Sequence, residues 1–202
     1  MFTSRLQKLQ TGFTLIEMMV ALSLFTIVVT IAVGAFLSMI GASKGVQGEQ
    51  SVMTTLTFVL DSMTREIRTG TNYYCGTRSY ISSNSISTST VNDCATGNEG
   101  VSFVESGSSV TVSASSRRIA YYYDTSSTPD TIMRRVGNGT PQSVVSEGIT
   151  ITKAEFFVTG TQRLNAGTDI NQPTVTIVLE ATDETGATTT LQTTVTQREL
   201  DI

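Results

Sequence analysis

Glu17 is the residue whose position most needs a chemical explanation, because it is a carboxylate at the start of a long apolar run. Residues 18–40 contain no charged side chain and are numerous enough to cross a bilayer as a helix. Placing a carboxylate at the edge of lipid costs a few kcal/mol unless a partner compensates it. A cut between Gly12 and Phe13 would create such a partner, an α-amino group four residues ahead of Glu17.

Residues 1–12, MFTSRLQKLQTG, are polar and carry two positive charges, Arg5 and Lys8. In a cleaved secretory signal the small-residue cleavage site follows the apolar region, whereas here Gly12 precedes it. Basic residues before the span and an acidic chain after it place the N-terminus in the cytoplasm. We therefore expect a leader at residues 1–12, a transmembrane and assembly helix at 13–42, and an extracytoplasmic globular domain at 43–202.

The stretch Gly12-Phe13-Thr14-Leu15-Ile16-Glu17 resembles the processing site of type IV prepilins and type II secretion pseudopilins. In that family a membrane prepilin peptidase cuts after the glycine and methylates the new amine, and the glutamate guides assembly. The resemblance implies that Gly12 and Phe13 are the processing residues and that Glu17 is the assembly residue. The alternative is an ordinary single-pass anchor with a chance glutamate at its edge.

The resemblance also implies where the protein goes and what it meets. It would be a single-pass inner-membrane protein and later part of an extracellular or periplasmic filament. Its partners would be other pilin or pseudopilin subunits, the prepilin peptidase, a pilus or secretion assembly platform and the lipid bilayer. No cofactor is expected, and energy for extraction must come from another protein because the chain has no nucleotide-binding loop.

The helical pattern continues beyond the span, with apolar residues at three- and four-residue steps from Val52 to Ile67. We expect this stripe to pack against the domain's own sheet rather than to form a groove for a partner helix. Gly41, Gly45 and Gly48 each cost about 1 kcal/mol in a helix, which predicts a bend or local unwinding. Thr69-Gly70 predicts the end of the helix.

Alternating apolar and polar residues after Tyr80 predict antiparallel strands. The fold class is therefore α+β, with a long N-terminal helix packed on an antiparallel sheet in a pilin-like arrangement. A final hairpin is expected around the turn at residues 183–186. Ser/Thr-rich stretches at 82–90 and 125–128 predict surface loops. The predicted strands are residues 110–115, 117–123, 132–136, 149–159, 175–179 and 191–195.

Cys75 and Cys94 are the only cysteines, and both follow the apolar segment. In an oxidising compartment they would form one disulfide that staples the loop between them. The alternative is a pair of free, partly buried thiols in a reducing compartment.

Several classes of function are disfavoured by composition. The chain has no histidine, which excludes Ser-His-Asp and Cys-His catalysis and the commonest zinc sites. Six carboxylates that an anchored surface enzyme might use are scattered through turns: Glu99, Glu105, Asp124, Asp130, Glu147 and Asp169. We therefore predict that the chain is not an enzyme and that it holds no catalytic or metal site.

A nucleic-acid partner is also disfavoured, because loss of residues 1–12 would bring the formal charge from −4 to −6. The pairs Arg117-Arg118 and Arg134-Arg135 could form a local basic patch, but paired arginines at an exposed strand edge are commoner.

Two further short patterns have plain structural interpretations. Tyr121-Tyr122-Tyr123 could stack a ligand, but alternate strand residues face opposite sides, so ordinary packing is favoured. Asn138-Gly139-Thr140 is spelled like a glycosylation acceptor and is interpreted as a turn.

The soluble part carries a looser resemblance to minor subunits of the PilW and pseudopilin J type, which sit at or near a filament tip. The similar stretches are FVLDSMTREIRTG, RRIAYYYD, IMRR and QTTVTQREL. These stretches do not separate a minor subunit from a major one, but the chain is longer than the commonest major pilins. It is interpreted as a structural subunit, minor rather than major, of a type IV pilus or a type II secretion pseudopilus. The alternatives are a tip adhesin or a DNA- or surface-binding pilin, whose binding loops a sequence rarely reveals.

Overall fold

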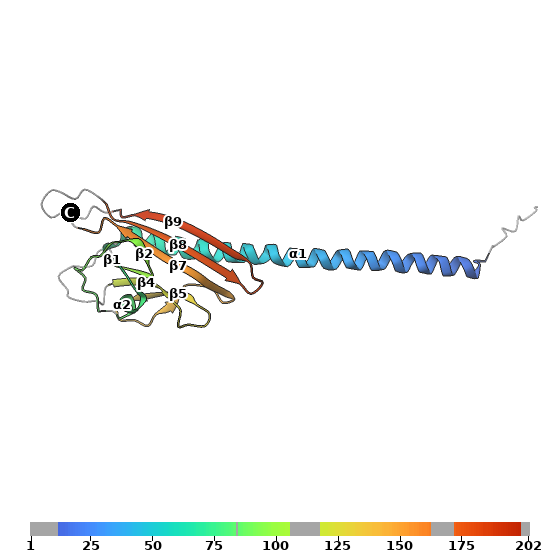
Figure 1. Ribbon diagram of the computed structural model, residues 1–202, viewed down its shortest axis with the longest axis horizontal. Coiled ribbons are helices and arrows are strands. Elements are labelled where there is room, and N and C mark those ends of the chain that lie inside the picture. The colour runs from blue at the N-terminus through green and yellow to red at the C-terminus, as the bar shows by residue number, and fades with distance from the viewer. Residues whose placement is uncertain (1–11, 84, 106–117, 163–171, 199–202) are drawn as a thin grey trace, which may run out of the picture. The chain divides into compact units, whose positions relative to one another are not determined.

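The computed structural model describes residues 12–83, 85–105, 118–162 and 172–198, and the chain divides into two compact units between Lys44 and Gly45. Two helices and nine strands are described (Figure 1). In chain order they are α1 (Leu15–Thr69), β1 (Thr71–Gly76), α2 (Arg78–Ser82), β2 (Cys94–Asn98), β3 (Gly100–Val104), β4 (Arg118–Asp124), β5 (Thr131–Val136), β6 (Gln142–Ser143), β7 (Ile149–Thr159), β8 (Thr174–Asp183) and β9 (Thr188–Thr196).

Within the second unit, α1 buries one face. The buried residues recur every three or four positions, as the sequence pattern predicts: Gly48, Val52, Leu56, Val59, Leu60, Met63 and Ile67. They share one hydrophobic core with residues of both sheets, so the stripe packs on the domain's own sheets as expected. The helix ends at Thr69 and Gly70 follows it, which confirms the predicted stop.

The unwinding predicted at the three glycines is wrong, because α1 is helical from Leu15 to Thr69 without interruption. Gly41 and Gly45 have no other atom near enough to touch an added Cβ. Gly48 is buried, and a Cβ there would come within 2.6 Å of Thr185 Oγ1. Glycine at position 48 therefore serves close packing of the β8–β9 turn on the helix rather than flexibility.

The strands form two antiparallel sheets. One sheet has the order β1-β3-β4-β5-β6 and the other has the order β2-β7-β8-β9. In the second sheet, Figure 1 shows β7, β8 and β9 running side by side. The long helix on antiparallel sheets confirms the α+β, pilin-like class.

Burial along the strands follows from their positions in these sheets. β8 alternates between buried and half-buried residues, as expected of a strand with one face on the core. β4 is buried on both faces: Tyr121 lies in the core against α1, whereas Ala120 and Tyr122 pack with Ile81 and Ile86. The tyrosine run is therefore ordinary packing on alternating faces, as predicted.

The predicted strands at 149–159 and 132–136 lie at β7 and β5, and the turn at residues 183–186 joins β8 to β9. Residues 137–139 form a turn, as expected for the Asn-Gly-Thr stretch. The predicted strand at 110–115 lies outside the described residues. Helix α2 and strands β1, β2 and β3 were not predicted, and Ile86 and Thr88 are buried in a stretch expected to be a surface loop.

Candidate functional site

The segment at the start of α1 places the candidate processing residues in the open. Gly12 has no atom within reach of an added Cβ, and the Phe13 side chain is 79% exposed. Neither residue is helical, since α1 begins at Leu15. The Gly12–Phe13 bond therefore lies in an exposed segment outside the helix. Residues 1–11 of the expected leader lie outside the described residues.

Thr14 caps this helix. The Glu17 backbone N–H donates to Thr14 Oγ1 at 3.3 Å, and the Met18 N–H donates to the Thr14 carbonyl at 3.2 Å. The spelling Thr-Leu-Ile-Glu is that of a capping box, in which the acidic residue stands at the third helical position. Glu17 therefore lies in the first turn, where the free N–H groups give the helix a partial positive charge that favours a carboxylate.

Beyond Glu17, α1 presents apolar side chains on all sides, and residues 18–40 are exposed throughout. Hydroxyl groups in this stretch are satisfied within the helix: Ser23 Oγ donates to the Val20 carbonyl at 2.9 Å, and Thr30 Oγ1 to the Thr26 carbonyl at 2.8 Å. Such bonds lower the cost of placing hydroxyl groups in lipid.

Among the described residues, α1 is the one helix long and apolar enough to cross a membrane. None of its most apolar stretch is buried within the protein. An apolar helix with no cover of its own requires lipid or other helices around it.

In the second unit, Cys75 and Cys94 form a disulfide with a Cα–Cα distance of 5.8 Å. The bond joins β1 to β2 and closes the segment that contains α2. The predicted pairing is therefore confirmed, and the alternative of two free thiols is wrong.

Arg118 also holds the segment between Cys75 and Cys94 in place, through hydrogen bonds to the carbonyls of Ser87 and Thr90. The sequence did not predict this role. The Arg118 guanidinium is buried, and its acceptors within the described residues are all neutral oxygens: the carbonyls of Asn72, Ser87, Thr90 and Ser102 and the Ser102 hydroxyl. Burial lowers the pKa of Arg118 to about 10, partly offset by the nearby Tyr74. The pattern that could have revealed the buried arginine is its position directly before the apolar and aromatic run of residues 119–123.

The other arginine pair is also engaged. Arg134 forms a two-pronged ion pair with Glu66 of α1, at 2.7 and 3.0 Å, and Tyr121 donates to the same carboxylate at 2.7 Å. Arg135 donates to the carbonyls of Ile81 and Ser82, at the C-terminal end of α2. The basic patch considered as an alternative is therefore not present at Arg118, Arg134 and Arg135, because internal acceptors hold all three. The favoured expectation of an exposed strand edge is also wrong for these residues, since β4 and β5 each lie between two other strands of their sheet. Arg117 lies outside the described residues.

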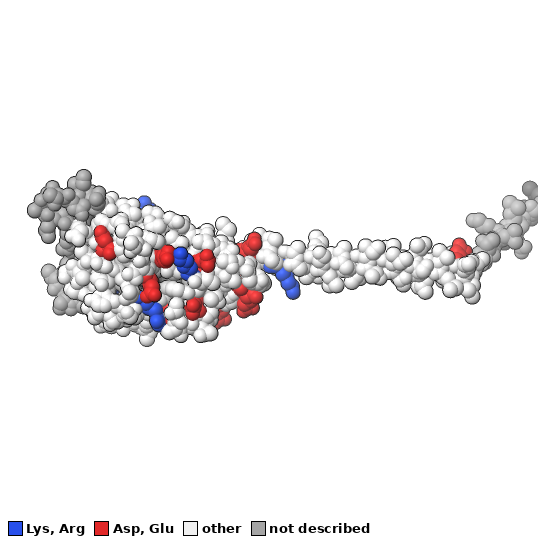
Figure 2. Space-filling view, in the orientation of Figure 1, with Lys and Arg blue, Asp and Glu red and all other residues white. Residues whose placement is uncertain are grey.

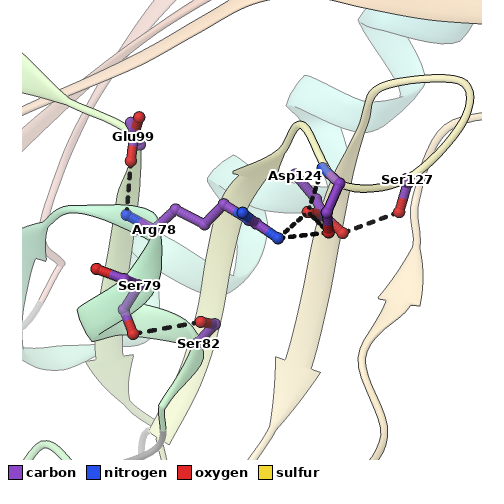
Figure 3. A network of polar contacts seen from close by, with 7 residues as sticks. Arg78, Ser79, Ser82, Glu99, Asp124 and Ser127 are labelled. Atoms are coloured by element: carbon purple, nitrogen blue, oxygen red, sulfur yellow. Dashed lines mark hydrogen bonds and ion pairs between the residues drawn. The ribbon is translucent and has the colours of Figure 1, made fainter.

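Figure 3 shows a further polar network around Arg78, at the start of α2. The Arg78 guanidinium pairs with Asp124 at 2.5 Å, and its backbone N–H donates to Glu99 at 2.8 Å. Burial opposes ionisation of Asp124, but hydrogen bonds from Ser126 and Ser127 together with the Arg78 charge hold its pKa below the usual range. The hydroxyls of Ser126 and Ser127 donate to the Asp124 carboxylate, which also pairs with Arg78. The network therefore fixes the loop after β4 to the start of α2.

Three of the carboxylates that the sequence scatters through turns take part in hydrogen bonds or ion pairs within the described residues. Across the part of the chain that the structure describes, no group of three or more His, Cys, Asp or Glu could hold a metal ion. Asp124 and Glu99 serve the Arg78 network, and Tyr123 donates to Asp130 at 3.1 Å. Asp169 lies outside the described residues.

Comparison with known families gives one match. Residues 7–33 match the prokaryotic N-terminal methylation motif. The chain has no significant match among curated proteins and none among solved structures. The matched segment contains Gly12, Phe13 and Glu17 and the first part of α1.

Proposed function

We propose that this chain, whose residues 7–33 carry a prepilin-type methylation motif, is a structural minor subunit of a type IV pilus or type II secretion pseudopilus. The motif supports the type IV pilin and pseudopilin family, which is structural rather than enzymatic. It also implies processing by a prepilin peptidase and assembly with other pilin subunits.

The observation that carries the proposal is the geometry at the start of α1. An exposed Gly12–Phe13 bond precedes a capped helix, and Glu17 lies in its first turn ahead of a wholly apolar stretch. Cleavage at that bond produces an amine in the same neighbourhood as the carboxylate. Each of these features suits a subunit that is cut, held in lipid and then packed among other helices.

The proposed sequence of events follows from these residues. The chain inserts into the inner membrane with residues 1–12 inside, and the peptidase cuts after Gly12 and methylates Phe13. The assembly platform then extracts the subunit, and the apolar stretch of α1 exchanges lipid for neighbouring helices. During this exchange Glu17 pairs with the N-terminal amine of a neighbour, which compensates its charge in a low-dielectric setting.

Substitution of Glu17 tests this role. Glu17→Gln keeps the size and the capping-box spelling while removing the charge. We expect Glu17→Gln to be cleaved like the wild type but to enter sheared filaments about tenfold less, since a buried charge pair is lost. Thr14→Val, which removes the cap but leaves the charge, is the matched control and should enter normally. Normal incorporation of Glu17→Gln would contradict the pairing.

A further inference from the structure

The second unit contains a groove of about 810 Å³ between the last turns of α1 and the edge strand β9. Arg65, Arg68 and Arg198 line it together with hydroxyl groups of β9, and Asp61 is the carboxylate among its lining residues. We call it the arginine groove. Arg65 lies 3.9 Å from Asp61, and both side chains are mostly exposed, so this ion pair contributes little. Among its described lining residues the groove therefore has three guanidinium groups against one carboxylate, which favours carboxylates as its ligand.

Carboxylates gather at another place in the same unit, where the β8–β9 turn meets the first turns of α1 after Lys44. An added Cβ at Gly48 would touch the turn, and one at Gly148 would lie 3.8 Å from Glu184 Oε1. We define the acidic end as Glu49, Glu147 and Glu184. All three are exposed, and none forms an ion pair within the described residues. Figure 2 shows acidic side chains clustered at one end of this unit.

The acidic end and the arginine groove cannot neutralise one another within one molecule. Glu49 and Arg68 stand nineteen residues apart on one continuous helix, so they are separated by about 29 Å at 1.5 Å per residue. Complementary surfaces at different ends of one unit suit a head-to-tail contact between copies. Such a contact joins two different surfaces, so it gives a ring if the rotation between copies closes and an open chain if it does not.

We propose that the arginine groove of one copy receives the acidic end of the next copy of this chain. The inference rests on the proposed function and requires that more than one copy of this minor subunit enters a filament. Charge complementarity carries it: three arginines meet three glutamates that have no ion-pair partner in the described part of their own molecule. The contact sets which subunit neighbours which, and it weakens as salt rises.

Cysteine cross-linking of the full-length chain in its own membrane tests the contact. Both native cysteines are held in a disulfide, so an introduced cysteine is the reactive thiol. Cells that co-express two single variants, Arg65→Cys and Glu184→Cys, should yield oxidised dimers. Cells that express either variant alone should not. Lys153→Cys with Glu184→Cys is the matched control, since Lys153 is an exposed cation of the same unit outside the groove. Dimers no more abundant than in this control would overturn the proposal.

Charge reversal gives an independent readout. We expect Arg65→Glu with Arg68→Glu to lower incorporation about tenfold and Glu147→Lys with Glu184→Lys, co-expressed, to restore it. Lys153→Glu should leave incorporation unchanged. Incorporation unaffected by the groove variant, or a loss that the partner variant does not restore, would count against the contact.

Two other occupants of the groove are outcomes of the same experiment. Heparin or DNA retained by the wild type and lost in Arg65→Glu with Arg68→Glu, without cross-linking, would make it a polyanion site and overturn the proposal. Residues 199–202 include two carboxylates, Glu199 and Asp201, so a variant that lacks these residues is included. Cross-links that form only in this variant would show that the groove is not free for a second copy.

The state of Phe13 separates failure of this inference from failure of the proposed function. In the same samples, a methylated Phe13 and a normal filament without cross-links would reject the contact alone. An uncut chain without any filament would reject the proposed function itself.

Discussion

Gly48 of α1 lies directly against Asp183, where β8 ends and the turn to β9 begins. Asp183 is itself held in place, because its carboxylate accepts hydrogen bonds from the Thr185 hydroxyl and from the backbone N–H groups of Thr185 and Ala187. These bonds hold the pKa of Asp183 below its usual range. A glycine that reads in the sequence as a weak point of the helix is therefore the point at which the last hairpin docks.

Gly48→Ala tests this docking. Alanine gains about 1 kcal/mol of helix propensity but overlaps a carboxylate that cannot move without losing its bonds, and overpacking costs about 1–3 kcal/mol. We expect a net loss of about 1 kcal/mol in the free energy of unfolding, measured on the full chain in detergent. Gly45→Ala meets no neighbouring atom and should be neutral or stabilising. Equal effects of the two substitutions would contradict the contact.

The disulfide between Cys75 and Cys94 should stabilise its own segment most. Closing a loop of 19 residues lowers the entropy of the unfolded chain, which raises the free energy of unfolding by about 3 kcal/mol. In Cys75→Ser with Cys94→Ser, amide exchange should rise in residues 77–93 more than in β8 and β9. Hydrogen exchange with mass spectrometry measures both regions in one sample. Uniform loss of protection would show that the bond is a global constraint instead.

Arg118 should be the least replaceable arginine of the described chain. Arg118→Met would leave several buried carbonyls unpaired at a cost of about 1–3 kcal/mol each, so we expect at least 3 kcal/mol of destabilisation. Arg118→Lys restores the charge but not the five-donor fork, and it should recover only part of the loss. Arg65→Lys, at an exposed site, should change stability by less than about 0.5 kcal/mol.

High pH should destabilise the second unit through its tyrosines. Burial and the hydrogen bond to Asp130 raise the pKa of Tyr123 to about 12, and burial with the bond to Glu66 raises the pKa of Tyr121. An unfolded tyrosine titrates near pH 10, so this stabilisation is complete below about pH 10 and is lost as pH rises towards about 12. Arg118, whose pKa is lowered, acts in the opposite direction.

Unfolding by denaturant at pH 8 and pH 11 measures this dependence. The wild type should be less stable at pH 11, and Tyr121→Phe with Tyr123→Phe should lose less stability over the same interval. If this variant lost as much stability between pH 8 and pH 11 as the wild type, groups other than Tyr121 and Tyr123 would be responsible for the loss.

The elements that the sequence predicts well are those with strong periodicity. The stripe from Val52 to Ile67 repeats at helical spacing, and β7 and β8 alternate cleanly, so their type and location follow from the pattern. Thr69-Gly70 marks the end of α1, and Gly186, with φ of 86°, occupies the predicted turn. At the start of α1, the spacing of Gly12 and Glu17 is the pattern from which the candidate processing and assembly residues were predicted.

The parts that the sequence does not predict depend on contacts between distant residues. Ile81 and Ile86 stand in a Ser/Thr-rich stretch, and they are buried in a cluster built on Ala120 and Tyr122 of β4. The acceptors of Arg118 are backbone carbonyls, which leave no pattern in a sequence. Likewise, the pair of Arg134 with Glu66 spans 68 positions, so its two members could not be matched in advance.

The intact mass of the protein purified from its own cell tests whether the chain is cut and methylated as proposed. We expect a chain that begins at Phe13 and carries one added methyl group on its α-amine, with the Cys75–Cys94 bond intact. Fragmentation of the N-terminal peptide places the methyl group on Phe13. A chain that still carries residues 1–12, or one that begins at another residue, would contradict the account.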